Sequence, residues 1–135
     1  MNTLEMSASM DQLAQLLNRQ PDILLATVFG SFASGHARAD SDVDISVLAD
    51  KPLDAGRKQE LIKLLAKASG CPVDLVDLRT AGVLLRRSAL LNGKRLVCRD
   101  NQIYADLLSR TLTDVEDFLP YRERLLKQRT NAWTS

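Results

Sequence analysis

Two apolar runs, separated by a segment rich in glycine, serine and aspartate, constrain the fold of this chain most. The first run is Ile23–Phe29, which ends at Gly30, and the second is Val43–Ala49, which follows Asp42. Short apolar runs bounded by turn residues predict buried strands. Because side chains alternate between the two faces of a strand, Asp42 and Asp44 should point the same way while the residue between them enters the core.

Two carboxylates on one face repel each other, so the pair is costly unless a cation lies between them. Mg²⁺ prefers oxygen ligands and commonly takes one or two carboxylates together with substrate phosphates. Gly30 lets the backbone approach a phosphate closely, and the Ser31 hydroxyl, with the free N–H groups of a helix opening there, can receive phosphate oxygens. A phosphate cradle followed by a metal clamp predicts nucleotidyl transfer. The alternative is a loop whose polar residues only serve turns.

The remainder of the chain alternates between strand and helix patterns, and it predicts an α/β (α+β) fold with a small mixed β-sheet flanked by helices. We expect a single nucleotidyltransferase domain over residues 1–135, in which residues 101–135 form a C-terminal helical segment and tail. Pro120 should end or kink that last helix. The expected helices are Ser9–Gln20, Leu53–Ser69, Thr80–Leu91 and 101 to about 128, and the further strands are Pro72–Leu78 and Arg95–Cys98.

The segment from Gly30 to Asp44 resembles the signature of the DNA polymerase beta-like nucleotidyltransferases, specifically the small minimal nucleotidyltransferase (MNT) proteins. Many of these proteins carry an arginine where this chain has Ser34. Arg38, four residues on, is the expected replacement for that cation near the triphosphate. The resemblance covers most of the chain and implies the polymerase beta-like fold.

The resemblance also implies a third carboxylate on a neighbouring strand, for which the chain offers Asp74 and Asp77. Three residues apart on a strand, these two side chains point to opposite faces, so only one of them can meet Asp44. We choose Asp74, because it lies mid-strand, where a carboxylate needs a reason to exist. Asp77 lies at the strand end and is expected to cap the following helix.

Composition narrows the choice of partners. A formal net charge of +1 gives no global field toward nucleic acid or a membrane surface, so no direct nucleic-acid binding and no membrane association are expected. No run of eighteen apolar residues and no signal peptide is apparent, which predicts a cytoplasmic protein. The cations between Tyr121 and Arg129, with Trp133 beyond them, fit either a partner-binding tail or a solvated helix end.

The expected activity is a nucleotidyl transfer dependent on Mg²⁺ (or Mn²⁺), with ATP as the substrate. Asp42 and Asp44 would hold metal, while Asp74 would share a second metal or take the acceptor's proton. The resemblance implies an antitoxin that attaches AMP to a Tyr, Ser or Thr hydroxyl of a partner HEPN ribonuclease toxin and so neutralises it. Two alternatives stay open: a non-catalytic antitoxin that binds and occludes its partner, and a nucleotidyltransferase for a small molecule.

Overall fold

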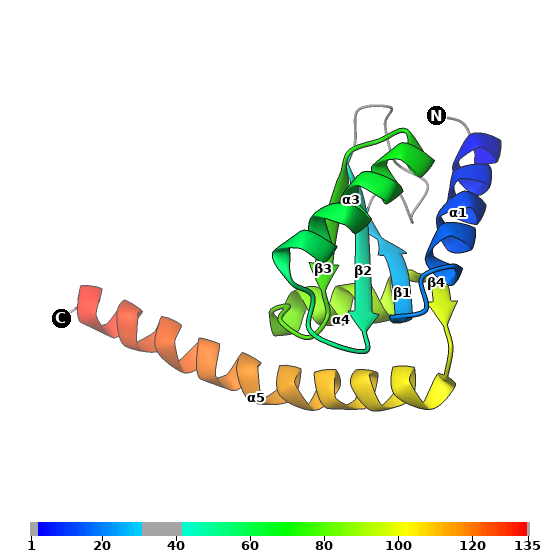
Figure 1. Ribbon diagram of the computed structural model, residues 1–135. Coiled ribbons are helices and arrows are strands. Elements are labelled where there is room, and N and C mark those ends of the chain that lie inside the picture. Colours follow the sequence, from blue (N-terminus) through cyan, green and yellow to red (C-terminus); the bar gives the residue numbers. More distant parts are fainter. Residues whose placement is uncertain (1–2, 31–41, 135) are drawn as a thin grey trace.

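The structure is a computed structural model that describes residues 3–30 and 42–134, with side chains described for residues 9–30 and 42–118 (Figure 1). These ranges form four strands and four helices. In chain order the elements are α1 (Thr3–Asn18), β1 (Ile23–Phe29), β2 (Val43–Ala49), α3 (Ala55–Ser69), β3 (Val73–Asp77), α4 (Val83–Leu91), β4 (Lys94–Cys98) and α5 (Asn101–Thr134). Both strands that flank the polar segment have the predicted bounds.

The four strands form one sheet in the order β3-β2-β1-β4. β1 pairs in antiparallel fashion with β2 and β4, whereas β2 and β3 are parallel and are joined through α3. The sheet is therefore mixed and flanked by helices, which confirms the predicted fold class.

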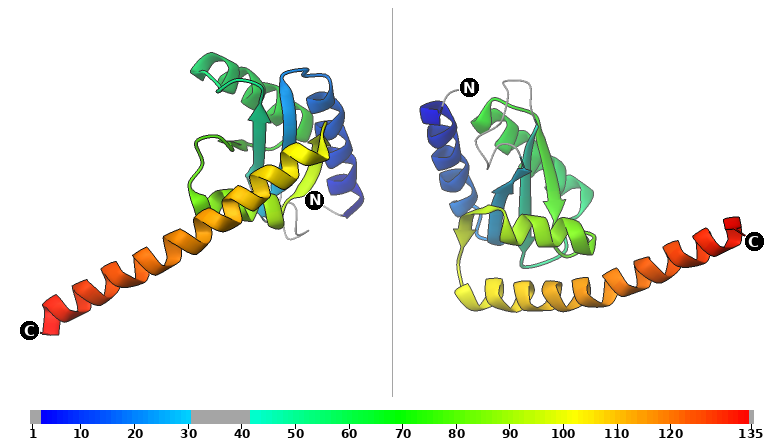
Figure 2. Two further views of the ribbon diagram at one scale, coloured as in Figure 1. Left: turned by 90° about the horizontal axis from the view of Figure 1, so that it is seen from below. Right: turned by 180° about the vertical axis from the view of Figure 1, so that it is seen from behind.

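Helices cover both faces of the sheet, with α3 in front of it and α4 behind it in Figure 1, and Figure 2 shows the same layers from other sides. Val43, Ile45 and Val47 pack with leucines of α1 and α3 in one buried cluster. Leu48 belongs to a second cluster, with residues of α4 and α5. Since neighbouring side chains of a strand alternate, Asp44 lies on the face of the sheet that α4 and α5 partly cover.

Both ends of α3 are capped. The Asp54 side chain accepts a hydrogen bond of 2.7 Å from the Arg57 backbone N–H. Gly70 follows the helix in the left-handed conformation, with φ of 71°, and its N–H donates to the Ala66 carbonyl at 2.9 Å. These caps fix where the connection between the two parallel strands begins and ends.

Several predicted boundaries are wrong. α1 spans Thr3–Asn18 rather than Ser9–Gln20, and α3 begins at Ala55 rather than Leu53. The bounds of β3 and the start of β4 differ from the prediction by one residue.

α4 begins at Val83 rather than Thr80, because Asp77 forms a turn first. The Asp77 side chain accepts a hydrogen bond from the Arg79 N–H at 3.0 Å. Its backbone carbonyl accepts from the N–H groups of Thr80 and Ala81. Asp77 therefore caps this turn and not the helix.

α5, predicted to run from residue 101 to about 128, continues to Thr134, and its axis changes direction along the way (Figure 1). Of the two outcomes expected of Pro120, an end or a kink, the helix does not end there. A helix can bend around a proline and so tolerate the lost hydrogen bond.

Within residues 3–30 and 42–134, no helix combines the length and apolar character needed to cross a membrane.

Candidate active site

Three carboxylates meet near the start of β2. Asp44 is the second residue of that strand and is half-buried, and its register partner on the neighbouring parallel strand β3 is Asp74. Register partners on adjacent strands point to the same face of a sheet. Asp42 lies just before β2 and is exposed, as is Asp74. The structure therefore brings together the three carboxylates that the sequence singled out.

The pKa of Asp44 reflects both its burial and its acidic neighbours. Burial raises the pKa of the Asp44 carboxyl above its ordinary value, and the negative charges of Asp74 and Asp42 raise it further. Each cause disfavours the ionised form, so ionised Asp44 is stabilised by any cation that approaches the group. This edge of the sheet is consequently suited to a positively charged ligand.

Gly30 closes the site from the end of β1. Its φ is +73°, in the left-handed region that other residues rarely adopt, and a Cβ built on it would overlap the Asp44 carboxylate. The register pair of Phe29 with Asp44 places this backbone directly beside the carboxylate. A ligand at Asp44 thus meets bare backbone rather than a side chain, which is what the proposed phosphate cradle requires.

Two buried hydroxyls, those of Thr27 and Ser46, lie next to the site on the same face of the sheet. Ser46, two residues after Asp44 on the same face, lies 2.6 Å from the Thr27 hydroxyl, which in turn donates to the Ala89 carbonyl of α4 at 2.9 Å. Because the Thr27 proton is used for Ala89, Ser46 is the donor to Thr27. Gly93 permits this approach, since a Cβ there would lie 2.9 Å from the Thr27 hydroxyl.

Thr27, Ser46 and Gly93 were not predicted from the sequence. For Thr27 and Ser46 the available signal was a hydroxyl residue inside each of two apolar strands, because such residues are buried only when they find hydrogen-bond partners. Asp77 lies on the face of the sheet that the alternation of side chains along the strand predicted. Its register partner is Val47, so it lies on the face of α1 and α3, away from Asp74.

The carboxylates fit a magnesium ion that completes its shell with substrate oxygens. In the part of the chain that the structure describes, no three His, Cys, Asp or Glu side chains are arranged to hold a metal on their own. Mg²⁺, however, is usually held by one or two carboxylates together with waters and substrate phosphates. Burial and the neighbouring carboxylates raise the pKa of Asp44, so such an ion would stabilise its ionised form.

Two residues of the predicted nucleotide site, Ser31 and Arg38, lie outside the described residues, and so does Ser34. The same holds for the side chains of the basic segment from Tyr121 and of Trp133.

Residues 11–102 match the family model of the polymerase beta nucleotidyltransferase domain. This match spans the whole sheet and every described residue of the site. The chain belongs to the polymerase beta nucleotidyltransferase family.

Among curated proteins, the chain is similar to the protein adenylyltransferase MntA of Shewanella oneidensis, with 39% identity over 87 residues. The matched segment spans 63% of this chain and 63% of that relative.

Solved structures agree over a greater length. A chain in a crystal structure of a toxin–antitoxin with AMP-PNP superposes with a TM-score of 0.79 at 30% identity, covering 90% of this chain and 98% of the other. A structure of the tri-AMPylated Shewanella oneidensis HEPN toxin in complex with its MNT antitoxin gives a TM-score of 0.75 at 28% identity, covering 93% and 98%. The expected resemblance to minimal nucleotidyltransferases is confirmed.

Proposed function

We propose that this protein is an antitoxin that transfers AMP from ATP to a Tyr, Ser or Thr hydroxyl of a partner HEPN ribonuclease toxin. The observation that carries the proposal is the register pair of Asp44 and Asp74, beside the bare backbone of Gly30. The similarity to a protein adenylyltransferase, and to antitoxin chains solved with AMP-PNP and with an AMPylated toxin, supports it.

In this proposal each carboxylate has a role. Asp42 and Asp44 hold Mg²⁺ (or Mn²⁺), which when bound neutralises the charge of the triphosphate. The Gly30 backbone, with Ser31 and Arg38, binds and orients the phosphates. Asp74, on the neighbouring strand, accepts the proton of the attacking hydroxyl.

The transfer itself is an in-line displacement. The acceptor oxygen forms a bond to the α-phosphorus of ATP as the bond between that phosphorus and the bridging oxygen breaks. Pyrophosphate leaves with the electron pair, and the hydroxyl proton passes to Asp74. Positioning and electrostatics supply the catalysis, since the chain contributes no covalent nucleophile in this scheme.

The modification explains neutralisation. AMP attached near a ribonuclease active site adds bulk and negative charge where RNA phosphates bind, so RNA is excluded by shape and by charge. Because ATP is the substrate and a ribonuclease the partner, we place this reaction in the cytoplasm.

The proposal is tested by co-expressing the chain with its genomic neighbour and measuring the intact mass of the neighbour. Wild type is compared with the Asp42→Asn/Asp44→Asn double variant and with Asp50→Asn, which removes an exposed carboxylate just after β2. We expect nucleotide adducts with wild type and Asp50→Asn but none with the double variant.

Other outcomes would assign a different function. Neutralisation by the double variant, without adducts in any sample, would replace the proposal with an antitoxin that binds and occludes. A wild-type protein that leaves the neighbour unmodified and modifies a small-molecule hydroxyl would make it a small-molecule nucleotidyltransferase.

A further inference from the structure

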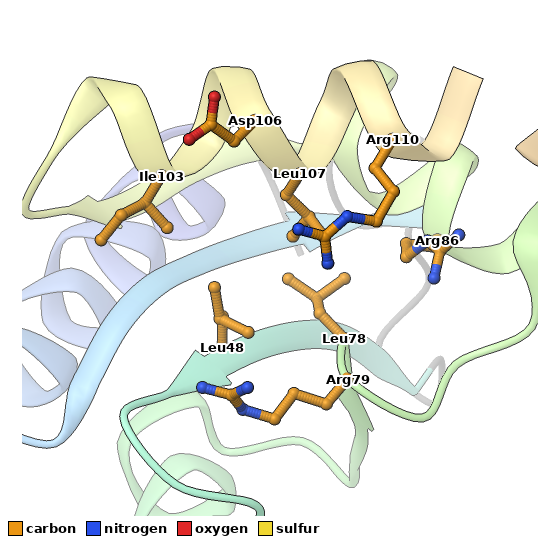
Figure 3. Close-up of a pocket in the computed structure, with 8 residues that line it drawn as sticks. All are labelled: Leu48, Leu78, Arg79, Arg86, Ile103, Asp106, Leu107 and Arg110. Atoms are coloured by element: carbon orange, nitrogen blue, oxygen red, sulfur yellow. The ribbon is translucent and has the colours of Figure 1, made fainter. Parts of the chain in front are cut away.

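A second concave site lies at the far end of the sheet from the carboxylates. It is a cavity of about 330 Å³ between the ends of β2 and β3 on one side and α4 and α5 on the other (Figure 3). Apolar residues of the sheet and of α5 form part of its wall, and three arginines complete it. The lining residues are Leu48, Leu78, Arg79, Arg86, Ile103, Asp106, Leu107 and Arg110.

The three arginines differ in how they are held. Arg79 donates to the Ala49 carbonyl from Nη2 at 2.8 Å and from Nε at 3.3 Å, so the sheet fixes its position. Arg86 pairs with Asp114 of α5 at 2.5 Å, and its Nε is buried with no hydrogen-bond partner among the described residues. Two of the cations are thus anchored by the fold.

Arg110 is the one of these three arginines whose side chain is not held by a hydrogen bond or ion pair to the described residues. It is exposed, and it forms no ion pair with any residue of the described side-chain ranges. In Figure 3 its guanidinium group reaches from α5 into the space between Leu107 and Arg86, whereas the Asp106 carboxylate points away from that space. The interior of the cavity is therefore cationic above an apolar floor of Leu48 and Leu78.

This combination indicates an occupant with an anionic group on an apolar body. Guanidinium groups bind carboxylates with directional hydrogen bonds, and an apolar floor favours aliphatic or aromatic carbon. A volume near 330 Å³ is at the lower end of the roughly 300–1,000 Å³ typical of small-molecule sites. It suits one or two protein side chains better than a complete nucleotide.

The cavity and the carboxylates share one face of the sheet. Leu48 is four residues after Asp44 on β2, about 13 Å away at ~3.3 Å per residue. α4 contacts this face between them, because the Ala89 carbonyl accepts from Thr27 at the level of Ser46. A molecule that fills the cavity and reaches Asp44 must lie across α4, where Leu84 and Leu85 are each 43% exposed.

We propose that this arginine-lined cavity is the docking site for the protein acceptor, and that it receives an acidic side chain of the partner together with an adjacent apolar one. The inference rests on the proposed function, because it names where the partner of that reaction is held. Docking at the cavity positions the acceptor hydroxyl at the carboxylates on the other side of α4. Arg110 supplies the cation that the incoming carboxylate meets.

The test uses Arg110→Glu in the full chain, with Lys63→Glu as its control. The control makes the same change of charge at an exposed position of α3, on the other side of the sheet. We expect Arg110→Glu to weaken binding of the partner toxin at least tenfold and to raise KM for the partner. Affinity for AMP-PNP, the melting temperature and kcat should stay near wild type, and Lys63→Glu should change none of these quantities.

A compensating change identifies the occupant. Acidic residues of the partner are changed to lysine one at a time, and we expect one of them to restore binding to Arg110→Glu while weakening binding to wild type. Equal effects of Arg110→Glu and Lys63→Glu, or no rescue by any partner lysine, would overturn the inference.

The two levels of the proposal fail in different ways. If wild type modifies the partner and Arg110→Glu does so equally well, the docking site is wrong and the proposed function stands. If wild type neither binds nor modifies the partner, both are wrong. Binding of AMP and of inorganic phosphate to wild type and to Arg110→Glu is measured as well. If Arg110→Glu no longer binds these anions but binds the partner as tightly as wild type does, the cavity is a small-anion site instead.

Discussion

The backbone of Gly30 lies so close to the Asp44 carboxylate that a Cβ at Gly30 would overlap Asp44 Oδ2. One residue therefore limits both the conformation of the chain after β1 and the space around the carboxylate proposed to bind metal. The pair joins two neighbouring strands that contribute different parts of the proposed site, since β1 leads into the phosphate cradle and β2 carries the acid.

Gly30→Ala should lower the transfer rate by about 100-fold, the effect of misplacing a reacting group by ~1 Å. The new methyl group must displace the Asp44 side chain, and the left-handed conformation adds about 1–2 kcal/mol of strain. Gly70→Ala is the matched control, because Gly70 has nearly the same φ, +71°, with no atom near a Cβ. It should lose similar stability and keep full activity. Equal loss of activity in both variants would mean that backbone strain alone matters.

Asp74→Ala should reduce the rate by at least ~100-fold, as expected when a catalytic base or a metal ligand is lost. Asp77→Ala should leave the rate within a few-fold of wild type, because its side chain faces the other side of the sheet. It should instead destabilise the fold by about 1 kcal/mol through the lost hydrogen bond from the Arg79 N–H. Single-turnover rates and denaturant unfolding of both variants distinguish the two roles. The reverse pattern would show that the catalytic face was chosen wrongly.

Asp44→Asn and Asp22→Asn should change stability in opposite directions at about pH 7. Burial and two like charges raise the pKa of Asp44, so its ionisation disfavours the fold, and removing the charge stabilises it. A hydrogen bond from Arg57 lowers the pKa of Asp22, so its ionised form favours the fold, and its loss destabilises by about 0.5–1 kcal/mol, as for a solvent-accessible ion pair.

The pH dependence follows from the same shifts. As the pH is lowered from 7, the stability gained by Asp44→Asn should begin to shrink before the pH reaches 3.8, the ordinary pKa of Asp. Folded wild type already protonates Asp44 in that range, because its pKa is raised. The loss from Asp22→Asn should persist below that value and vanish only as Asp22 itself is protonated. Unfolding free energies of the three proteins between about pH 7 and pH 3 provide the measurement. A destabilised Asp44→Asn protein at neutral pH would contradict this account of the site.

Chelation should abolish transfer, and added Mg²⁺ or Mn²⁺ should restore it, because no described side chain beside Asp44 can neutralise a triphosphate. Together with AMP-PNP, Mg²⁺ should also raise the melting temperature of wild type and not that of the Asp42→Asn/Asp44→Asn variant. Full activity in the presence of chelator would contradict the role assigned to these carboxylates.

The sequence predicted the strands of the site accurately for a physical reason. Ile23–Phe29 and Val43–Ala49 are buried almost throughout, so their limits coincide with the limits of their apolar runs. Alternation along a strand then sufficed to place Asp44 and to separate Asp74 from Asp77. Local rules succeeded here because they act within a single element.

Features that depend on several elements could not be predicted in this way. The arginine-lined cavity combines residues from β2, the turn after β3, α4 and α5, and no local pattern relates Leu48 to Arg110. The start of α4 was misplaced because an aspartate before a helical pattern serves a turn as readily as a helix cap. Pro120 was predicted to end or kink α5, and the sequence alone does not decide between these outcomes, because propensity does not show how far a helix can bend.

The parallel pairing of β2 with β3 also sets when the site can first exist. Asp44 and Asp74 become neighbours only after the chain has passed through α3, thirty residues later, from 44 to 74. At typical rates of ~5–20 residues per second, a ribosome needs roughly 2 to 6 s to add that segment. A nascent chain that ends before β3 contains Asp44 but not Asp74, so the two carboxylates cannot yet lie side by side. The neutralising activity proposed here would therefore appear only some time after β1 and β2 have been synthesised.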